Sequence, residues 1–430
     1  MKFRVTILIL LLAGGSRALA AGGPTSFVVN GLKVIVQQNT STDIVAASMC
    51  YRGGAAVLNS HEAGIEKLAL AVAVKASDRY PKDKLNATIE RMNTALSSSA
   101  SLDFSSVDMQ CVKQYFDASW DVFTDVILHP AITTEDVELE RQQMLTGLKQ
   151  MRDNPDAYLS DLVRRAFYVD HPYETSVDGE VETVSSFTPE QLKSYLAKRT
   201  TPAQMLLIVV GNVSPEDIEA KVKAAFGAIS QGSYTMPLPP AVQHHEPSLK
   251  IVHRVLPTNY IEGYFPSPSL SSSDYYAMAA AGAVLRYRLF EEVRTKRSLS
   301  YAPGGGIGGN FANFGYIYVT AVEPDTTIKV MSAELRKMMT EPVSLAELRN
   351  TVNTFITGYY LRNETNRSQA NVLARYELSG AGYQEAANFI SDVKKVTPEE
   401  IQNACKKYIK NLQFVIIGNP ESLEVKNFAF

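Results

Sequence analysis

The stretch FTPEQLKSYLAKRTTPAQMLLIVVGN, residues 187–212, decides the fold because it occurs twice. It returns as VTPEEIQNACKKYIKNLQFVIIGN at residues 396–419. Each copy starts with Thr and Pro, which are favoured at a helix N-cap and at the first helical position. An amphipathic helical pattern follows, and then an apolar strand that stops at Gly-Asn. The sequence therefore predicts the same helix and strand in each half of the chain.

A second repeat lies upstream at nearly the same offset, since ELERQQMLTGLKQMRDNPD at 138–156 aligns with ELRNTVNTFITGYYLRNET at 347–365. Between the halves, residues 231–250 hold four prolines and no apolar period, so we expect an extended linker there. We predict an α+β fold of two homologous lobes, each a mainly antiparallel sheet with helices packed on one face. The predicted lobes span residues 21–230 and 251–430.

Residues 1–20 have the order of a secretory signal peptide: the basic Lys2 and Arg4, a short apolar run, and Ala18-Leu19-Ala20 at the end. A membrane anchor is the weaker alternative, because the run is too short to cross about 30 Å of hydrocarbon. We therefore expect a secreted, periplasmic protein without a membrane span after cleavage.

The chain has 430 residues, 45% of them hydrophobic and 20% charged, which suits two well-cored lobes. Removal of residues 1–20 takes Lys2, Arg4 and Arg17 from the 42 Lys and Arg. It leaves 39 against 45 Asp and Glu, a net charge of −6. An acidic chain of this kind argues against a nucleic-acid partner.

Three cysteines are too few for a disulfide framework. A bridge between Cys50 and Cys111 stays open, because an oxidising compartment permits it. Buried free thiols are the favoured interpretation.

Residues 27–64, FVVNGLKVIVQQNTSTDIVAASMCYRGGAAVLNSHEAG, open with N-G-L and continue to Y-R-G-G before a helix. Residues 138–174 contain a predicted helix with the pair Glu-Arg, a turn with the sequence D-N-P, and the tripeptide H-P-Y. In order and spacing, these segments resemble the pitrilysin/insulinase family of metallopeptidases, which includes mitochondrial processing peptidase and the bc1 core subunits. The resemblance covers about residues 26–425.

The resemblance implies an inverted zinc motif, H-x-x-E-H, on the helix that follows residue 64. The two imidazole positions are Lys67 and Ala71, and the position of the general base is Leu70. The third ligand, a Glu, would fall at Thr146 or Gly147. None of these side chains binds zinc or takes a proton from its water. We therefore expect no cofactor in this chain and no peptide hydrolysis by this chain alone.

In the second half, RLFEEVRTKRSLSYAPGGGIGG at residues 288–309 is similar to the family's R-L-F-x-E-V-R-E-K-x-x-L-x-Y. The resemblance implies that Arg294 and Tyr301 bind substrate and its oxyanion across the chamber of a dimer, in trans. Both side chains donate hydrogen bonds, as such a role requires. The alternative is a solvated helix Arg and a packed strand Tyr. A shorter stretch between Asp274 and Arg288 than the family has indicates a reshaped wall.

Other candidate motifs are weaker. His244, His245 and His253 could bind a metal, but adjacent residues in a linker point opposite ways, so incidental imidazoles are favoured. Gly304, Gly306 and Gly309 fit G-x-G-x-x-G by chance, since a strand and not a helix follows.

The leading hypothesis is a non-catalytic subunit of a secreted zinc metallopeptidase. Its partner would be a homologous subunit that carries the zinc, and the pair would bind peptide substrates. The alternative is a non-enzymatic peptide-binding or assembly protein of the same fold. An intact H-x-x-E-H in a neighbouring reading frame would favour the first.

Overall fold

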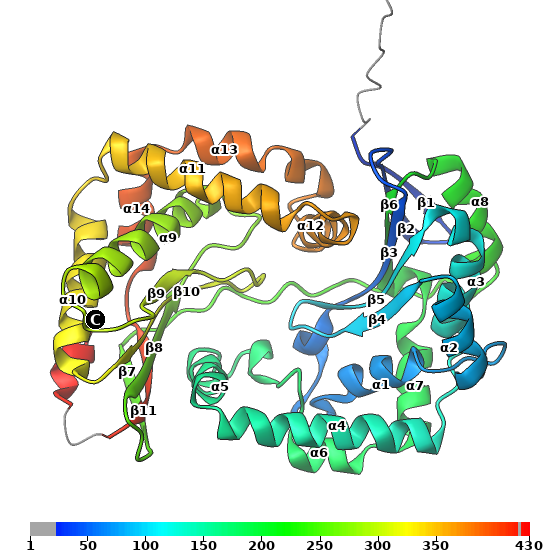
Figure 1. Cartoon of the computed structure of the whole chain (residues 1–430), viewed down its shortest axis with the longest axis horizontal. Coiled ribbons are helices and arrows are strands. Elements are labelled where there is room, and N and C mark those ends of the chain that lie inside the picture. The colour runs from blue at the N-terminus through cyan, green and yellow to red at the C-terminus, as the bar shows by residue number, and fades with distance from the viewer. Residues whose placement is uncertain (1–22, 420–422) are drawn as a thin grey trace, which may run out of the picture.

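The computed structural model describes residues 23–419 and 423–430, which form two α+β lobes facing each other across a central space (Figure 1). This confirms the predicted fold class. The predicted signal peptide, residues 1–20, lies outside the described residues. Among the described helices, none combines the length and the apolar character that a membrane crossing requires.

The first lobe contains a six-stranded sheet in the order β1-β2-β6-β3-β5-β4. Its strands are β1 (Thr25–Val29), β2 (Leu32–Gln38), β3 (Ile44–Arg52), β4 (Ala95–Ser99), β5 (Phe104–Val112) and β6 (Met205–Gly211). The second lobe contains a five-stranded sheet in the order β7-β11-β8-β10-β9. Its strands are β7 (Ser248–His253), β8 (Asn259–Pro266), β9 (Gly304–Ile307), β10 (Phe314–Ala321) and β11 (Gln413–Gly418).

Without β1, the two sheets have the same topology strand for strand. The repeated strands β6 and β11 both take the second position and pair in parallel with β2 and β7 respectively. All other neighbouring strands are antiparallel. The internal sequence repeat is therefore a repeat of structure.

The helices pack mainly on one face of each sheet. In the first lobe they are α1 (Ile65–Ala73), α2 (Lys82–Arg91), α3 (Phe116–Leu128), α4 (Thr134–Asp153), α5 (Pro155–Phe167), α6 (Val181–Ser186), α7 (Pro189–Arg199) and α8 (Pro215–Phe226). In the second lobe they are α9 (Tyr275–Leu289), α10 (Pro324–Thr340), α11 (Leu345–Arg362), α12 (Asn366–Leu378), α13 (Phe389–Lys395) and α14 (Pro398–Tyr408). The repeated helices α7 and α14 begin as the sequence predicts, because Thr188 and Thr397 accept the backbone N–H of the third helical residue.

Each lobe also lends one helix to the other, as Figure 1 shows. Helix α5 of the first lobe covers β8 and β11, and helix α12 of the second lobe covers β3 and β6. Phe167 of α5 packs with Val415 and Ile417, while Leu373 of α12 packs with Ile208. The reason lies in the strands: β6 and β11 are buried at every residue, so both faces of each sheet need an apolar cover. The sequence repeat gives no sign of this exchange.

The segment between α8 and β7 crosses from one lobe to the other without forming a helix or strand. It is held by polar contacts: the Tyr234 hydroxyl donates to the Arg52 carbonyl at 3.3 Å, and the His171 ring is bonded to the Pro240 carbonyl at 2.9 Å. Strand β7 begins at Ser248, inside the range 231–250 predicted as linker. The exact domain limits stay predictions.

The contact between α5 and β8 contains a titrating carboxyl group. Glu262 is 7% exposed, and the Ser160 hydroxyl of α5 lies 3.5 Å from its Oε2. Burial raises the pKa of Glu262 to about 7, and the nearby Asp156 adds to this. Between its ordinary pKa and 7, the folded chain therefore holds a proton that the unfolded chain has released.

We expect the contribution of Glu262 to the stability of the wild-type chain to be fully present below the ordinary pKa of a glutamate and to be lost as pH rises from there through about 7. Glu262→Gln should remove this dependence and raise the free energy of unfolding at pH 8 by about 2 kcal/mol. Urea unfolding of both chains across this pH range measures the effect. Equal pH profiles for the two chains would contradict it.

Candidate functional site

Helix α1 is the helix on which the resemblance places the zinc motif. It begins after Gly64, whose φ of 87° is in the left-handed region. A Cβ at Gly64 would lie 2.8 Å from the Cα of Gly179, so a side chain there would push away the loop before α6. This close contact fixes the start of α1 against the loop.

The structure brings Lys67 and Ala71 of α1 together with Gly147 of α4 around one cavity of about 360 Å³. Leu70 does not line it, because its side chain is 2% exposed in the main core of the first lobe. Thr146 is exposed on α4 and does not line it either. Of the two positions considered for the third ligand, Gly147 is thus the one that faces the cavity.

The charges of this cavity neutralise one another. The Lys67 ammonium forms an ion pair with Asp178, and Glu140 is paired with Lys75 at 2.9 Å. An ammonium, a methyl group and a glycine supply no zinc ligand, and both carboxylates already hold a lysine. Across residues 23–419 and 423–430, no cluster of three or more His, Cys, Asp or Glu side chains is placed to hold a metal. Zinc therefore does not fit the residues present here.

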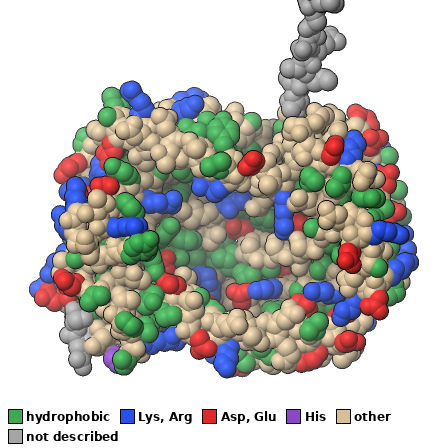
Figure 2. Space-filling model, in the orientation of Figure 1, with side chains coloured by type: hydrophobic (Ala, Val, Ile, Leu, Met, Phe, Trp, Pro, Cys, Tyr) green, Lys and Arg blue, Asp and Glu red, His purple; other side chains and the backbone are tan. Residues whose placement is uncertain are grey.

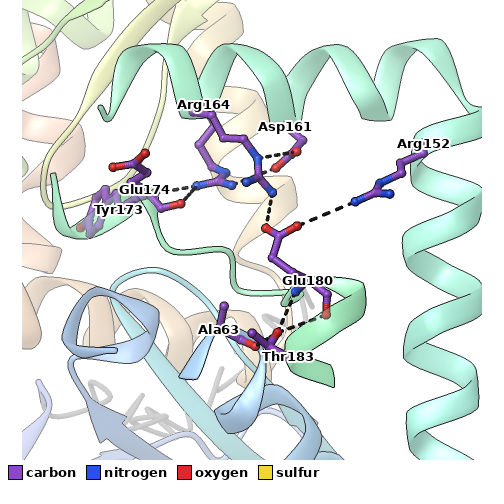
Figure 3. Close-up of polar contacts among 9 residues, drawn as sticks. Ala63, Arg152, Asp161, Arg164, Tyr173, Glu174, Glu180 and Thr183 are labelled. Atoms are coloured by element: carbon purple, nitrogen blue, oxygen red, sulfur yellow. Dashed lines mark hydrogen bonds and ion pairs between the residues drawn. The ribbon is translucent and has the colours of Figure 1, made fainter. Parts of the chain in front are cut away.

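A polar network positions the loop that carries Asp178 (Figure 3). The carboxylate of Glu180 lies 2.5 Å from Arg165 of α5 and 3.9 Å from Arg152 of α4. The Thr183 hydroxyl donates to the Ala63 carbonyl at 2.8 Å, just before α1 begins. The ends of α1, α4, α5 and α6 are thus tied together around the cavity.

A buried ion pair anchors α1 from the other side. Glu66, directly before Lys67, is 3% exposed and lies 3.3 Å from Arg199 of α7, which is 7% exposed. Burial raises the pKa of Glu66, while Arg199 acts in the opposite direction. Arg199 also donates to the Arg52 carbonyl at 2.6 Å and to Gln204 at 3.1 Å. The guanidinium therefore joins α1, β3 and the end of α7.

In the second lobe, Arg294 and Tyr301 lie together. Arg294 is in the π-helical turn Phe290–Thr295 that follows α9, and its guanidinium carbon is 4.0 Å from the centre of the Tyr301 ring and 4.9 Å from that of Phe290. Tyr301 is 78% exposed and lies outside any strand, so the alternative of a packed strand residue does not describe it. Among the described residues, no side-chain partner hydrogen-bonds or ion-pairs with the guanidinium or the phenol. Neither residue lines the first-lobe cavity, and their role stays a prediction.

His244 and the cysteines occupy structural positions, whereas His245 and His253 are exposed. The His244 ring is bonded to the Phe167 carbonyl at 2.9 Å and packs against the Phe167 ring, so it is no free surface imidazole. Cys50, Cys111 and Cys405 are buried free thiols. Cys50 packs under α12 and Cys111 in the core on the other face of the sheet, which places the two apart.

Two protein-family models match this chain. The model described as insulinase (peptidase family M16) matches residues 33–180, and the model described as peptidase M16 inactive domain matches residues 186–355. The chain belongs to the insulinase family, M16. The first model covers most of the first lobe, and the second begins at α7 of the first lobe and extends into α11 of the second.

Relatives and solved structures agree with this family. The chain is 28% identical over 305 residues to a protein described as an uncharacterized zinc protease from Mycobacterium leprae, covering 68% of each. It is 22% identical over 404 residues to an uncharacterized zinc protease from Rickettsia felis, covering 92% of this chain and 97% of the relative. A crystal structure of a peptidase M16 inactive domain from Pseudomonas fluorescens superposes with a TM-score of 0.85 at 17% identity, over 94% of this chain and 99% of that one.

Several residues around the site could not be found from sequence alone. Asp178, the partner of Lys67, is more than a hundred residues away along the chain. Glu66 offers a weak signal, because it is the one acidic residue in the first turn of a helix that is apolar after Lys67, but Arg199 as its partner required the tertiary structure.

We expect the purified mature chain to hold far less than one equivalent of zinc, and the variant Lys67→His/Ala71→His/Gly147→Glu to hold about one. Room exists for the new carboxylate, because a Cβ at Gly147 has no heavy atom within 4 Å. Metal analysis after dialysis measures the content. The variant should still cleave no peptide, since the buried Leu70 remains in place of a general base.

The matched control carries Gln in place of the new Glu at position 147 and should bind zinc more weakly, because it lacks one charged ligand. Stoichiometric zinc in the wild-type chain would overturn the interpretation of the cavity.

Proposed function

We propose that this chain is the catalytically incomplete subunit of an exported, periplasmic M16 peptidase, pairing with a homologous subunit that carries the zinc. In this pair it helps to bind the peptide substrate and contributes Arg294 and Tyr301 to the oxyanion. Its own first lobe takes no part in the chemistry.

One contrast carries the proposal. The first-lobe cavity has no zinc ligand, and its charged side chains form ion pairs within the chain: Lys67 with Asp178, and Glu140 with Lys75. By contrast, the guanidinium of Arg294 is bonded to no described carboxylate and stacks on the exposed ring of Tyr301. A fixed guanidinium with unused donors is suited to an oxygen that gains negative charge. The π-helical turn that presents it is a feature often found at functional sites.

The space between the lobes supports peptide binding. Figure 2 shows a hollow on this face, with hydrophobic side chains inside it and Lys and Arg around it. A cavity of about 450 Å³ is lined from both lobes, by Ser99 of β4, Asp108 of β5 and Arg367 of α12 among others. Strand β4 is an edge strand that pairs only with β5 among the described strands. Its free backbone groups can pair with an extended peptide.

The experiment is co-expression of this chain with a homologue that has an intact H-x-x-E-H, followed by size-exclusion chromatography, zinc analysis and a peptide-cleavage assay. We expect a complex with zinc in the homologue only, and cleavage only by the complex. The homologue with its motif Glu replaced by Gln serves as control and should form the complex without cleaving.

Failure to form a complex with any zinc-bearing homologue of the same cell would overturn the proposal in favour of a non-enzymatic peptide-binding protein. Peptide cleavage by the isolated chain would overturn both the proposed subunit function and the non-enzymatic alternative.

A further inference from the structure

The second lobe contains a cavity of about 580 Å³ that none of the predicted site residues lines. It lies between α9, α11, α12 and the glycine-rich segment after β9. Its lining includes Arg286, Arg362 and Arg375 and no Asp, Glu, Lys or His. We call it the arginine cavity. Three positive charges without a negative one among the lining residues stand out in a chain whose formal net charge is −3.

These arginines are not used up by ion pairs within the chain. Arg286 donates to the Gly305 carbonyl at 3.1 Å and Arg375 to the Gly309 carbonyl, but none of the described carboxylates forms an ion pair with either or with Arg362. Arg375 does act on Asp103 of the adjoining cavity, whose pKa burial raises and the guanidinium lowers. Arg288 shows the usual alternative, since it holds Glu347 through two bonds of 2.7 and 2.9 Å. Unpaired cations in a concave site concentrate positive potential and attract an anion.

Besides the arginines and the polar Asn363, Ser368 and Asn371, the lining is apolar and aromatic. The rings of Tyr359 and Phe389 stack with their centres 4.4 Å apart, and the Phe355 ring lies 5.8 Å from Phe389. All three line the arginine cavity. Flat aromatic walls bind an apolar group, whereas bare phosphate or sulfate would leave them unused. The lining therefore fits an anion carried on an apolar stem.

The arginine cavity adjoins the cavity between the lobes. Ser368, Asn371 and Arg375 of α12 line both. An extended chain that lies between the lobes can thus place a side chain against Arg375. A peptide is long enough to contact both cavities at once. A small free anion would contact only the arginine cavity and would gain no binding energy from the cavity between the lobes.

We infer that the arginine cavity binds an acidic residue of a peptide, with the carboxylate on the three arginines and a neighbouring apolar side chain on the aromatic rings. This inference rests on the peptide binding of the proposed function and names its substrate class. It requires neither zinc nor a partner subunit.

The test measures binding of two fluorescent pentapeptides to the isolated mature chain, both with blocked ends and with Leu and Phe flanking a central Glu or Gln. We expect the Glu peptide to bind about tenfold more tightly, the range for a hydrogen bond to a charged group. Arg362→Gln should reduce this preference, because only Arg286 and Arg375 then remain for the carboxylate. Arg362 is exposed and forms no hydrogen bond with another described residue, so its replacement should not change folding.

Arg349→Gln is the matched control, because Arg349 is an exposed arginine of the same helix that does not line the cavity. It should keep the full preference for Glu. Equal affinity for the two peptides would overturn the inference. Displacement of both peptides alike by inorganic phosphate, at an ionic strength matched with chloride, would instead make the cavity a phosphate site. Because the isolated chain is measured, failure here is distinct from failure to pair with a zinc-bearing subunit.

Discussion

Arg199→Met is expected to lower the free energy of unfolding by about 3–5 kcal/mol, the cost of removing one partner of a buried ion pair. Its partner Glu66 is 3% exposed and would be left as an unpaired carboxylate within the first lobe. The bonds from Arg199 to the Arg52 carbonyl and to Gln204 would be lost as well. Urea unfolding at neutral pH measures the change.

Two variants separate this cause from a general loss of packing. Lys67→Met removes the neighbouring pair with Asp178, whose side chains are 43% and 58% exposed, and should cost less than about 1 kcal/mol. Glu66→Leu/Arg199→Met replaces both charges by apolar groups and should recover most of the stability. If Arg199→Met unfolded like the Lys67 variant, the ion pair would not be what holds α1 in place.

Arg294→Ala and Tyr301→Phe are each expected to lower kcat of the reconstituted peptidase pair by up to about 10²-fold, the range for loss of one oxyanion donor. The two losses should combine to less than their product, because both donors serve one oxygen. The measurement is steady-state kinetics on the complex with the zinc-bearing homologue. Zinc content should be unchanged.

The stacked arrangement allows a finer control. Arg294→Lys keeps the charge but loses the planar group that lies 4.0 Å from the Tyr301 ring, so it should recover little activity. Phe290→Leu removes the other ring beside the guanidinium without removing a donor and should have a smaller effect. If both Arg294→Ala and Tyr301→Phe kept the wild-type kcat, Arg294 and Tyr301 would have no catalytic role, and the non-enzymatic function would be favoured.

The sequence predicted the lobes because their signals are local. Thr188 and Thr397 cap helices, prolines follow them, and apolar runs of six or seven residues become β6 and β11. Such signals depend on neighbours within one turn or strand, and the internal repeat contains each of them in both lobes. The resemblance to the family, and not a local signal, gave Lys67 and Ala71 as the ligand positions, and helical spacing adds only that the two lie on one face of α1.

What the sequence could not predict depends on contacts between distant residues. The repeat does not say that α5 and α12 each cover the other lobe's sheet, because an apolar helix face fits either sheet. The pairing of Glu66 with Arg199 and the meeting of Arg286, Arg362 and Arg375 in one cavity follow from that packing.

By itself, the sequence determined the two α+β lobes, because helix capping, helical periodicity and strand patterns are properties of short segments. Only the tertiary structure decided that Gly147 and not Thr146 faces the cavity, that Lys67 is neutralised by Asp178, and that Arg286, Arg362 and Arg375 line one cavity in the second lobe. The physical reason is that burial and charge pairing are set by what lies across space, and the chain's order does not encode those distances directly.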